Sequence, residues 1–80
     1  MNLYLLSQTV NDDYDTYDSC VVAALSEDDA RTIHPYDSPY KDESWDASTW
    51  ASPNDVMVAF VGVADSSIAR GVICASFNAG

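Results

Sequence analysis

Four short apolar segments interrupt this 80-residue chain, and their length is the feature that most restricts its fold. They span residues 1–8, 19–25, 56–63 and 72–77, and none exceeds eight residues. Runs of this length, rich in Val, Leu and aromatic residues and bounded by turn-forming residues, are typical of β-strands. A membrane-spanning helix needs about 20 consecutive apolar residues. We therefore expect four strands and no membrane span.

Alternation within two of the segments predicts which residues share a face of the sheet. In the first segment, Leu3 and Leu5 are expected on one face, with Tyr4 and Leu6 on the other. The third segment divides in the same way into two apolar sets. One set is Val56, Val58 and Phe60, and the opposite set is Met57, Val61 and Val63.

A short helix is predicted between the second and third strands. Ser26 is a residue type preferred at helix N-caps. Asp29, three positions later, can accept a hydrogen bond from the backbone N–H at the cap, as in a capping box. Pro35 ends the helix, which leaves about two turns, with Ala30 and Ile33 facing inward. A helix this short is unstable alone, so it must pack against the sheet.

The order of these elements predicts an α+β fold in a single domain, residues 1–80. Strand, strand, short helix, long loop, strand, strand (ββα-loop-ββ) fits a small four-stranded, largely antiparallel sheet with one short helix on one face. The long loop spans residues 36–54 and contains Tyr36, Tyr40, Trp45 and Trp50. Loops of this length are often functional, but we expect at least one Trp to cover the sheet.

Charge restricts the partners more than any motif does. Thirteen Asp and Glu against three Lys and Arg give a formal net charge of −10, and twelve of the acids lie between residues 12 and 55. Such a chain is repelled by nucleic acid and by anionic membranes, so a basic protein surface is the expected partner. If the first loop, the helix start and the long loop lie on one side, the acids form a single anionic face. The alternative is that the charge serves solubility alone.

Closely spaced carboxylates can imitate the phosphates of B-DNA, which carry about one charge per 1.7 Å. Tyr and Trp add affinity, because they are enriched among the residues that dominate binding energy at interfaces. The residues expected to bind a partner are Asp12, Asp13, Asp15, Asp18, Glu27, Asp28, Tyr14, Tyr17 and Trp45.

Catalytic and metal-binding readings find little support. An EF-hand reading of Asn11, Asp13 and Asp15 places Thr16 where the loop needs Gly, and Val22 where it needs Glu. The chain has one His, no metal-ligand spacing and no Gly-rich phosphate loop. We expect no enzymatic activity, no metal and no cofactor. Sequestration of anionic nucleotides is disfavoured, because only three basic residues are present.

Two cysteines, Cys20 and Cys74, lie within apolar runs, where a free thiol behaves as a small hydrophobic side chain. Adjacent strands could bring them together, so a disulfide remains open at this point. The N-terminus lacks the charged and apolar regions of a signal peptide. A reducing, cytoplasmic location is therefore expected.

Three stretches of the chain carry a resemblance to known proteins. They are YLLSQTVNDDYDTYDS at residues 4–19, Ala30-Arg31 with His34-Pro35, and RGVICASFNAG at residues 70–80. Together they resemble a family of small proteins encoded by bacteriophages and prophages, over most of the chain and least in residues 36–50. That family mostly lacks an assigned function, so the resemblance implies no catalytic residues.

In size and charge the chain is also similar to anti-CRISPR proteins, several of which resemble nucleic acid and block a surveillance complex. This similarity implies an inhibitor of a bacterial defence system, acting on a CRISPR effector complex or another basic host protein in the cytoplasm of the infected bacterium. The alternative is a self-associating phage structural or housekeeping protein, in which residues 1–8 form an edge strand that pairs across a two-fold axis. Monomer and homodimer both remain open.

Overall fold

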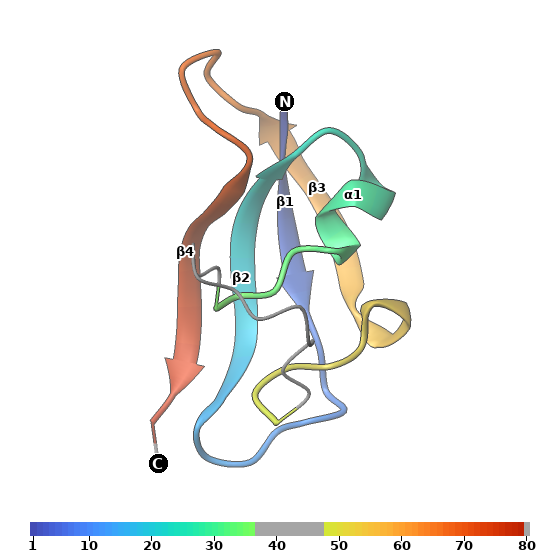
Figure 1. The fold of residues 1–80 in the computed structure, drawn as a ribbon, viewed down its shortest axis with the longest axis vertical. Helices are drawn as coiled ribbons and strands as arrows, with labels where there is room; N and C mark the ends of the chain where they lie inside the picture. Colours follow the sequence, from blue (N-terminus) through green and yellow to red (C-terminus); the bar gives the residue numbers. More distant parts are fainter. Residues whose placement is uncertain (37–47, 80) are drawn as a thin grey trace.

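The computed structural model describes residues 1–36 and 48–79 (Figure 1). Within them the chain has the predicted α+β fold, with four antiparallel strands in one open sheet and one short α-helix. The elements in order are β1 (Asn2–Ser7), β2 (Thr16–Ala24), α1 (Glu27–Arg31), the 3₁₀ turn η1 (Pro53–Asp55), β3 (Met57–Val63) and β4 (Gly71–Asn78).

The strand order is β3-β1-β2-β4, and every neighbouring pair is antiparallel. The β1–β2 hairpin forms the centre of the sheet, and β3 and β4 form its edges (Figure 1). The expectation that residues 1–8 form an edge strand is therefore wrong. Because β1 is hydrogen-bonded on both sides, its backbone is not available to pair with a second copy.

The predicted alternation in β1 is confirmed. Tyr4 and Leu6 are buried, with 6% and 0% of their surface exposed, whereas Leu5 is 40% exposed. Tyr4 pairs with Val22 and Leu6 with Cys20, and these partners are also buried. We call this side the covered face and the side that carries Leu5 the open face.

A β-bulge in β3 changes its predicted faces. Leu3 pairs with Gly62 and Tyr4 with Phe60, so Val61 is an extra residue in the strand. One extra residue reverses the alternation beyond it. Val63 consequently pairs with Asn2, whose side-chain amide donates a hydrogen bond to the Tyr4 hydroxyl at 3.1 Å. Val63 therefore lies on the Tyr4 side, and its predicted grouping with Met57 is wrong.

The helix begins as predicted. The Ser26 hydroxyl caps it by accepting a hydrogen bond from the Asp29 amide. The backbone N–H of Leu25, one residue before the N-cap, donates in turn to the Asp29 carboxylate at 2.9 Å. Ala30 and Ile33 are 0% and 4% exposed, which confirms them as the residues that face the core.

The covered face is closed by α1 and by residues 48–56, which cross it (Figure 1). Trp50 is fully buried in this layer, which confirms the structural role expected for one Trp. Arg31 links α1 to the residue that precedes β3, because its guanidinium donates a hydrogen bond to the Val56 carbonyl. Burial of one large aromatic ring removes about 150–250 Å² from water, so Trp50 is a major part of this small core.

Both cysteines are free thiols. Cys20 lies in the core, and burial raises the pKa of its thiol to about 12. Cys74 lies on the neighbouring strand, opposite Val21, and is exposed. The expectation of an apolar environment therefore holds for Cys20 and is wrong for Cys74, because Cys74 pairs with Val21, which lies opposite Leu5 on the open face.

Candidate partner-binding surface

The loop between β1 and β2, residues 8–15, is held by a buried glutamine. Gln8 is 4% exposed, and its amide nitrogen donates hydrogen bonds to the carbonyls of Asn11 and Tyr17 at 2.7 and 2.8 Å. Its amide oxygen accepts from the Asn11 backbone N–H at 2.8 Å. One side chain therefore satisfies three backbone groups of the loop and fixes its exit from β1.

A second set of contacts fixes the other half of the loop. Thr16 is 3% exposed, and its hydroxyl donates to the Asp13 carbonyl at 2.6 Å. The backbone N–H of Asp15 donates to the carbonyl of Asn78 in β4 at 2.6 Å. Asp15 has a φ of 61°, in the left-handed region that Asp and Asn tolerate better than most residues. The loop is thus joined to the end of the neighbouring edge strand.

Four carboxylates lie on or beside this ordered loop, and all are exposed. We call Asp12, Asp13, Asp15 and Asp18, together with Tyr14, the acidic end of the molecule. Tyr14 is 73% exposed. Among the described residues, neither ion pair involves the acidic end: Arg31 lies 3.9 Å from Glu27, and Arg70 lies 2.9 Å from Asp29. The cations of the described chain are therefore engaged elsewhere.

The other acids predicted to bind a partner lie at the opposite end of β2. Glu27 and Asp28 are exposed in the first turn of α1. Asp29, beside them, binds Arg70 through both carboxylate oxygens, at 2.9–3.1 Å. This contact, together with the Leu25 amide, lowers the pKa of Asp29 below its ordinary value. The acids of the helix end are thus partly engaged in holding the fold.

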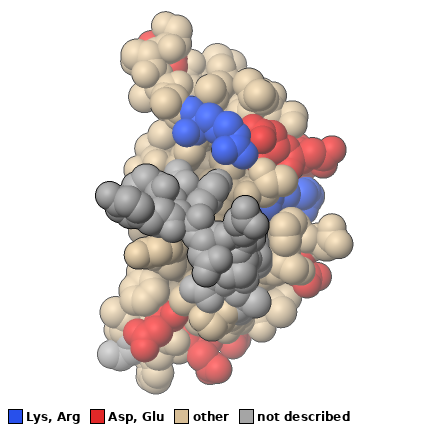
Figure 2. Space-filling view, viewed as in Figure 1, with Lys and Arg blue, Asp and Glu red and all other residues tan. Residues whose placement is uncertain are grey.

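Figure 2 shows how the two groups are distributed over the covered face. Acidic surface lies at the lower end of the long axis and, separately, on the right side above the middle, where Lys or Arg surface adjoins it. Asp18 is the third residue of β2, so the six residues 19–24 separate the groups, which corresponds to about 20 Å of extended strand. The described acids that were predicted to bind a partner therefore form two groups and not one continuous face, and Asp55 and Asp65 lie outside both groups.

Tyr17 is half-buried and lies in β2, although the sequence suggested an exposed residue. Its ring packs against Phe77 with centroids 4.9 Å apart and against His34 at 6.5 Å. Its backbone N–H donates to the Thr49 carbonyl at 2.8 Å. Alternation from Cys20 and Val22 alone would place Tyr17 on the open face, but the β2–β4 register shifts between Tyr17 and Ser19, and Tyr17 packs against the core.

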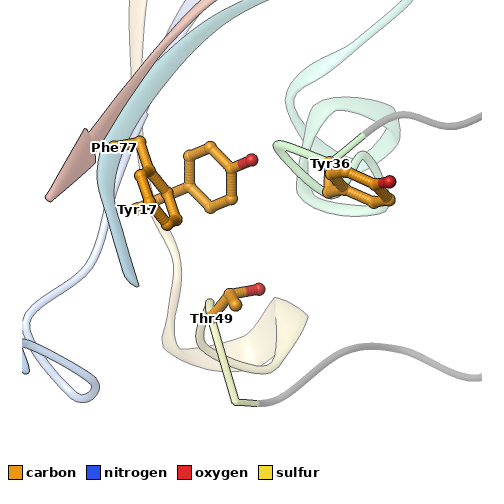
Figure 3. A pocket seen from close by; sticks show the side chains of 4 residues that line it. All are labelled: Tyr17, Tyr36, Thr49 and Phe77. Carbon is orange, nitrogen blue, oxygen red and sulfur yellow. The ribbon is translucent and has the colours of Figure 1, made fainter. Parts of the chain in front are cut away.

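An aromatic pocket adjoins the acidic end. Tyr17, Phe77, Tyr36 and Thr49 line a cavity of about 240 Å³ (Figure 3). Tyr17 and Phe77 form one side, and Tyr36 faces them from the other, with the Tyr17 hydroxyl directed toward it. Aromatic faces beside carboxylates attract a cationic group. The sequence did not indicate this pocket, because its residues come from four separate segments.

Trp45 lies outside the described residues, as does Lys41. No group of three potential metal ligands occurs among residues 1–36 and 48–79. In the same ranges no helix is long and apolar enough to cross a membrane.

Several residues that shape the site were not identified from sequence. The loop is positioned by Gln8, Thr16 and Asn78, and the Asp29 carboxylate is paired with Arg70. Each of these is a polar residue among other polar residues, so the sequence alone does not single it out. Their roles depend on burial and on contacts between distant segments. The only local signal is that Gln8 directly follows an apolar strand, where a buried amide can end the ladder.

Comparison with known proteins adds no relative. No protein-family model matches the chain, and no curated protein or solved structure gives a significant match.

Proposed function

We propose that this protein is a phage-encoded inhibitor of a bacterial defence system, similar in action to anti-CRISPR proteins. It binds the basic, nucleic-acid-binding surface of a host protein or CRISPR effector complex in the cytoplasm of the infected bacterium, and it needs neither cofactor nor catalysis. One observation carries the proposal. The acidic end presents four exposed carboxylates on an ordered loop that has no ion pair within the described residues.

Order in the loop matters because binding by a flexible loop loses conformational entropy. Contacts from Gln8 and Thr16 hold the loop before any partner arrives. A preorganised loop avoids that cost, so more of the electrostatic attraction appears as affinity. Four carboxylates within seven residues, from Asp12 to Asp18, also approach the charge density of a phosphate backbone.

Aromatic groups supply the part of the affinity that salt does not remove. Tyr14 projects from the centre of the acidic end and is 73% exposed. The pocket formed by Tyr17, Tyr36 and Phe77 has the composition that accepts a Lys or Arg side chain through cation–π contacts. A basic surface would therefore place one cation in the pocket and others against the carboxylates.

The helix end is a second contact for a long partner surface. Glu27 and Asp28 are about 20 Å from Asp18 of the acidic end along β2, which is within reach of a channel that holds a nucleic-acid helix. A smaller basic partner contacts the acidic end alone. The two cases differ in whether Glu27 and Asp28 contribute to affinity.

The test is a pull-down of tagged protein from a bacterial lysate that carries CRISPR and other defence systems, at about 50 and 500 mM NaCl. Two matched variants each reduce the net charge from −10 to −6. The first carries Asn at residues 12, 13, 15 and 18, and the second carries Asp42→Asn, Glu43→Gln, Asp55→Asn and Asp65→Asn, none of which is among the predicted partner-binding residues. We expect a nucleic-acid-binding protein to be captured at low salt by wild type, and its capture to be lost with the first variant.

Equal loss with both variants would show that net charge alone matters and would contradict a specific role for the acidic end. Capture that is unaffected by salt would contradict the electrostatic mechanism. Tyr14→Ala separates affinity from charge, because it leaves the net charge at −10. We expect it to lower the affinity for the captured protein about tenfold, as removal of an interface Tyr often does.

A further inference from the structure

The edge strand β3 exposes an unusual amount of apolar surface. Four of its seven residues are large hydrophobic side chains that are at least half exposed: Met57 (52%), Phe60 (62%), Val61 (58%) and Val63 (75%). The strand contains no charged residue and no Pro. Edge strands of soluble proteins usually carry such residues, which prevent pairing with other chains. Because β3 lacks them, it requires an explanation.

The exposed side chains lie on both faces of the sheet. Phe60 packs edge-on against Tyr4, with ring centroids 5.9 Å apart, and so lies on the covered face, as does Val63. Met57 pairs with Ser7 and lies on the open face, and Val61 is the bulged residue beside Gly62. A partner that packs on the open face would leave Phe60 and Val63 in water. A strand added along the edge contacts the side chains on both faces.

The backbone of β3 is suited to such an addition. Among the described residues β3 pairs with β1 on one side and with no strand on the other. In an antiparallel ladder alternate residues direct their N–H and C=O groups to opposite sides. About half of the peptide groups of β3 therefore point away from β1 and can accept another strand.

The charge of the protein and of its strands indicates which kind of chain supplies the added strand. Each copy of the protein carries −10, and among the residues of the four strands only Asp18 is charged. A basic partner is attracted to the carboxylates and gains nothing electrostatically from β3. A second β3 is equally uncharged, and it brings Phe and β-branched residues, which form favourable cross-strand pairs. In such a pair the carboxylates nearest the contact are those of Asp55 and Asp65, which are exposed at the two ends of β3, and added salt screens their repulsion.

We propose that β3 is a self-association site, where two copies pair their β3 strands antiparallel across a two-fold axis into one eight-stranded sheet. A two-fold contact uses the same patch twice and closes, whereas pairing of β3 with β4 would continue indefinitely. Seven residues extend about 23 Å in a sheet roughly 10 Å thick. The contact area along this edge is therefore smaller than the area of a standard protein–protein interface. The dimer is therefore weak and depends on concentration.

Salt distinguishes this contact from the proposed inhibitor function. Added salt weakens attraction to a basic partner, but it screens the repulsion between two copies of charge −10 and strengthens their association. The inference does not depend on the proposed function, and either can fail alone.

The experiment is sedimentation velocity from about 10 µM to 1 mM, at about 50 and 500 mM NaCl. Val63→Lys is the test variant, and Leu25→Lys is its control, because Leu25 is also exposed (70%) but lies outside the sheet. Either lysine changes the net charge from −10 to −9, which by itself favours association. We expect a wild-type dimer that increases with salt, at least tenfold weaker association for Val63→Lys, and no loss for Leu25→Lys.

A monomer at every concentration and salt would overturn the proposal and assign β3 to another occupant. Equal loss with the control, or species that grow beyond the dimer, would also overturn it. Hydrogen exchange of wild type gives a second measurement that needs no variant. Amide protection in β3 should rise with protein concentration, and protection that stays constant contradicts the pairing.

Discussion

The two acidic regions of this protein use the same side-chain chemistry for different purposes. At the helix end Asp29 binds Arg70 and the Leu25 amide, so its carboxylate helps hold α1 and the β3–β4 connection together. At the acidic end the carboxylates are exposed, and the loop is held instead by Gln8, Thr16 and backbone groups. An acid that lies beside one of the few cations therefore helps to hold the fold, whereas the acids far from any described cation are available to bind a partner. Four predictions test this contrast.

The largest expected effect is loss of the loop's internal support. Gln8→Leu preserves approximate volume but leaves three backbone groups of Asn11 and Tyr17 without their partner. These hydrogen bonds are only part-buried, so each costs less than the roughly 1–3 kcal/mol of a fully buried unpaired group, and we expect a total loss of about 2 kcal/mol in the free energy of unfolding, measured by urea denaturation. Thr9→Ala, at an exposed neighbouring site, should change it by less than about 0.5 kcal/mol. Equal effects of the two variants would mean that Gln8 does not hold the loop.

The next effect concerns the helix end. Arg70→Ala removes the two-point contact with Asp29 and a hydrogen bond to the Thr32 hydroxyl. Because the pair is partly exposed, we expect a loss of about 1 kcal/mol in the free energy of unfolding. Asp28→Ala, also in the first turn of α1, is the control and should cost a few tenths, about 0.3 kcal/mol. A thermal unfolding series that ranks the two variants equally would contradict a structural role for Asp29 and Arg70.

The same contact predicts a pH dependence. The hydrogen bonds from Arg70 and the Leu25 amide lower the pKa of Asp29 in the folded state below the ordinary value of 3.8. The contribution to stability is therefore complete above that value and is lost as the pH falls through the lower, folded-state pKa. The stability difference between wild type and Arg70→Ala should be constant near neutral pH and shrink in acid. A difference that grows as the pH falls would contradict this assignment.

The smallest effect is expected at the acidic end. Changing Asp12, Asp13, Asp15 and Asp18 to Asn should leave the free energy of unfolding within about 0.5 kcal/mol of wild type, or raise it slightly at low salt through reduced self-repulsion. Asn suits the left-handed conformation of Asp15, whereas Asp15→Val should cost about 1–2 kcal/mol because its φ is 61°. A large destabilisation by the four Asn substitutions, measured by urea denaturation, would show that these acids are structural.

Local patterns predicted the elements well. The Ser26 cap, the inward positions of Ala30 and Ile33, and the alternation of Tyr4 with Leu5 all depend on neighbouring residues, and all are confirmed. The strand order was not predictable in this way. Which strand flanks the hairpin depends on contacts between distant segments, so the expectation that β1 is an edge strand was wrong.

The candidate site was predicted only in part. Exposure of Asp12 and Tyr14 follows from a polar loop, and the structure agrees. The burial of Tyr17 depends on Phe77 and His34, from other segments. The bulge at Val61 was not predicted, although Gly62 inside the strand is a local sign of one. Long-range contacts therefore decided both which aromatic residue is exposed and which face Val63 occupies. Binding by the nine predicted residues stays a prediction.

The strand order has a consequence for how the chain folds. Only the central hairpin is closed by a short loop, whereas Ser7 pairs with Met57 and Ala23 with Gly71, about 50 positions apart. Closing such distant pairs costs chain entropy before it is repaid, so folding should take milliseconds to seconds, with the hairpin as template. Until both outer strands dock, the two long sides of that template are exposed to other nascent chains. Because β3 and β4 dock slowly onto the hairpin, the yield of folded protein should depend on the rate of synthesis as well as on the stability of the folded state.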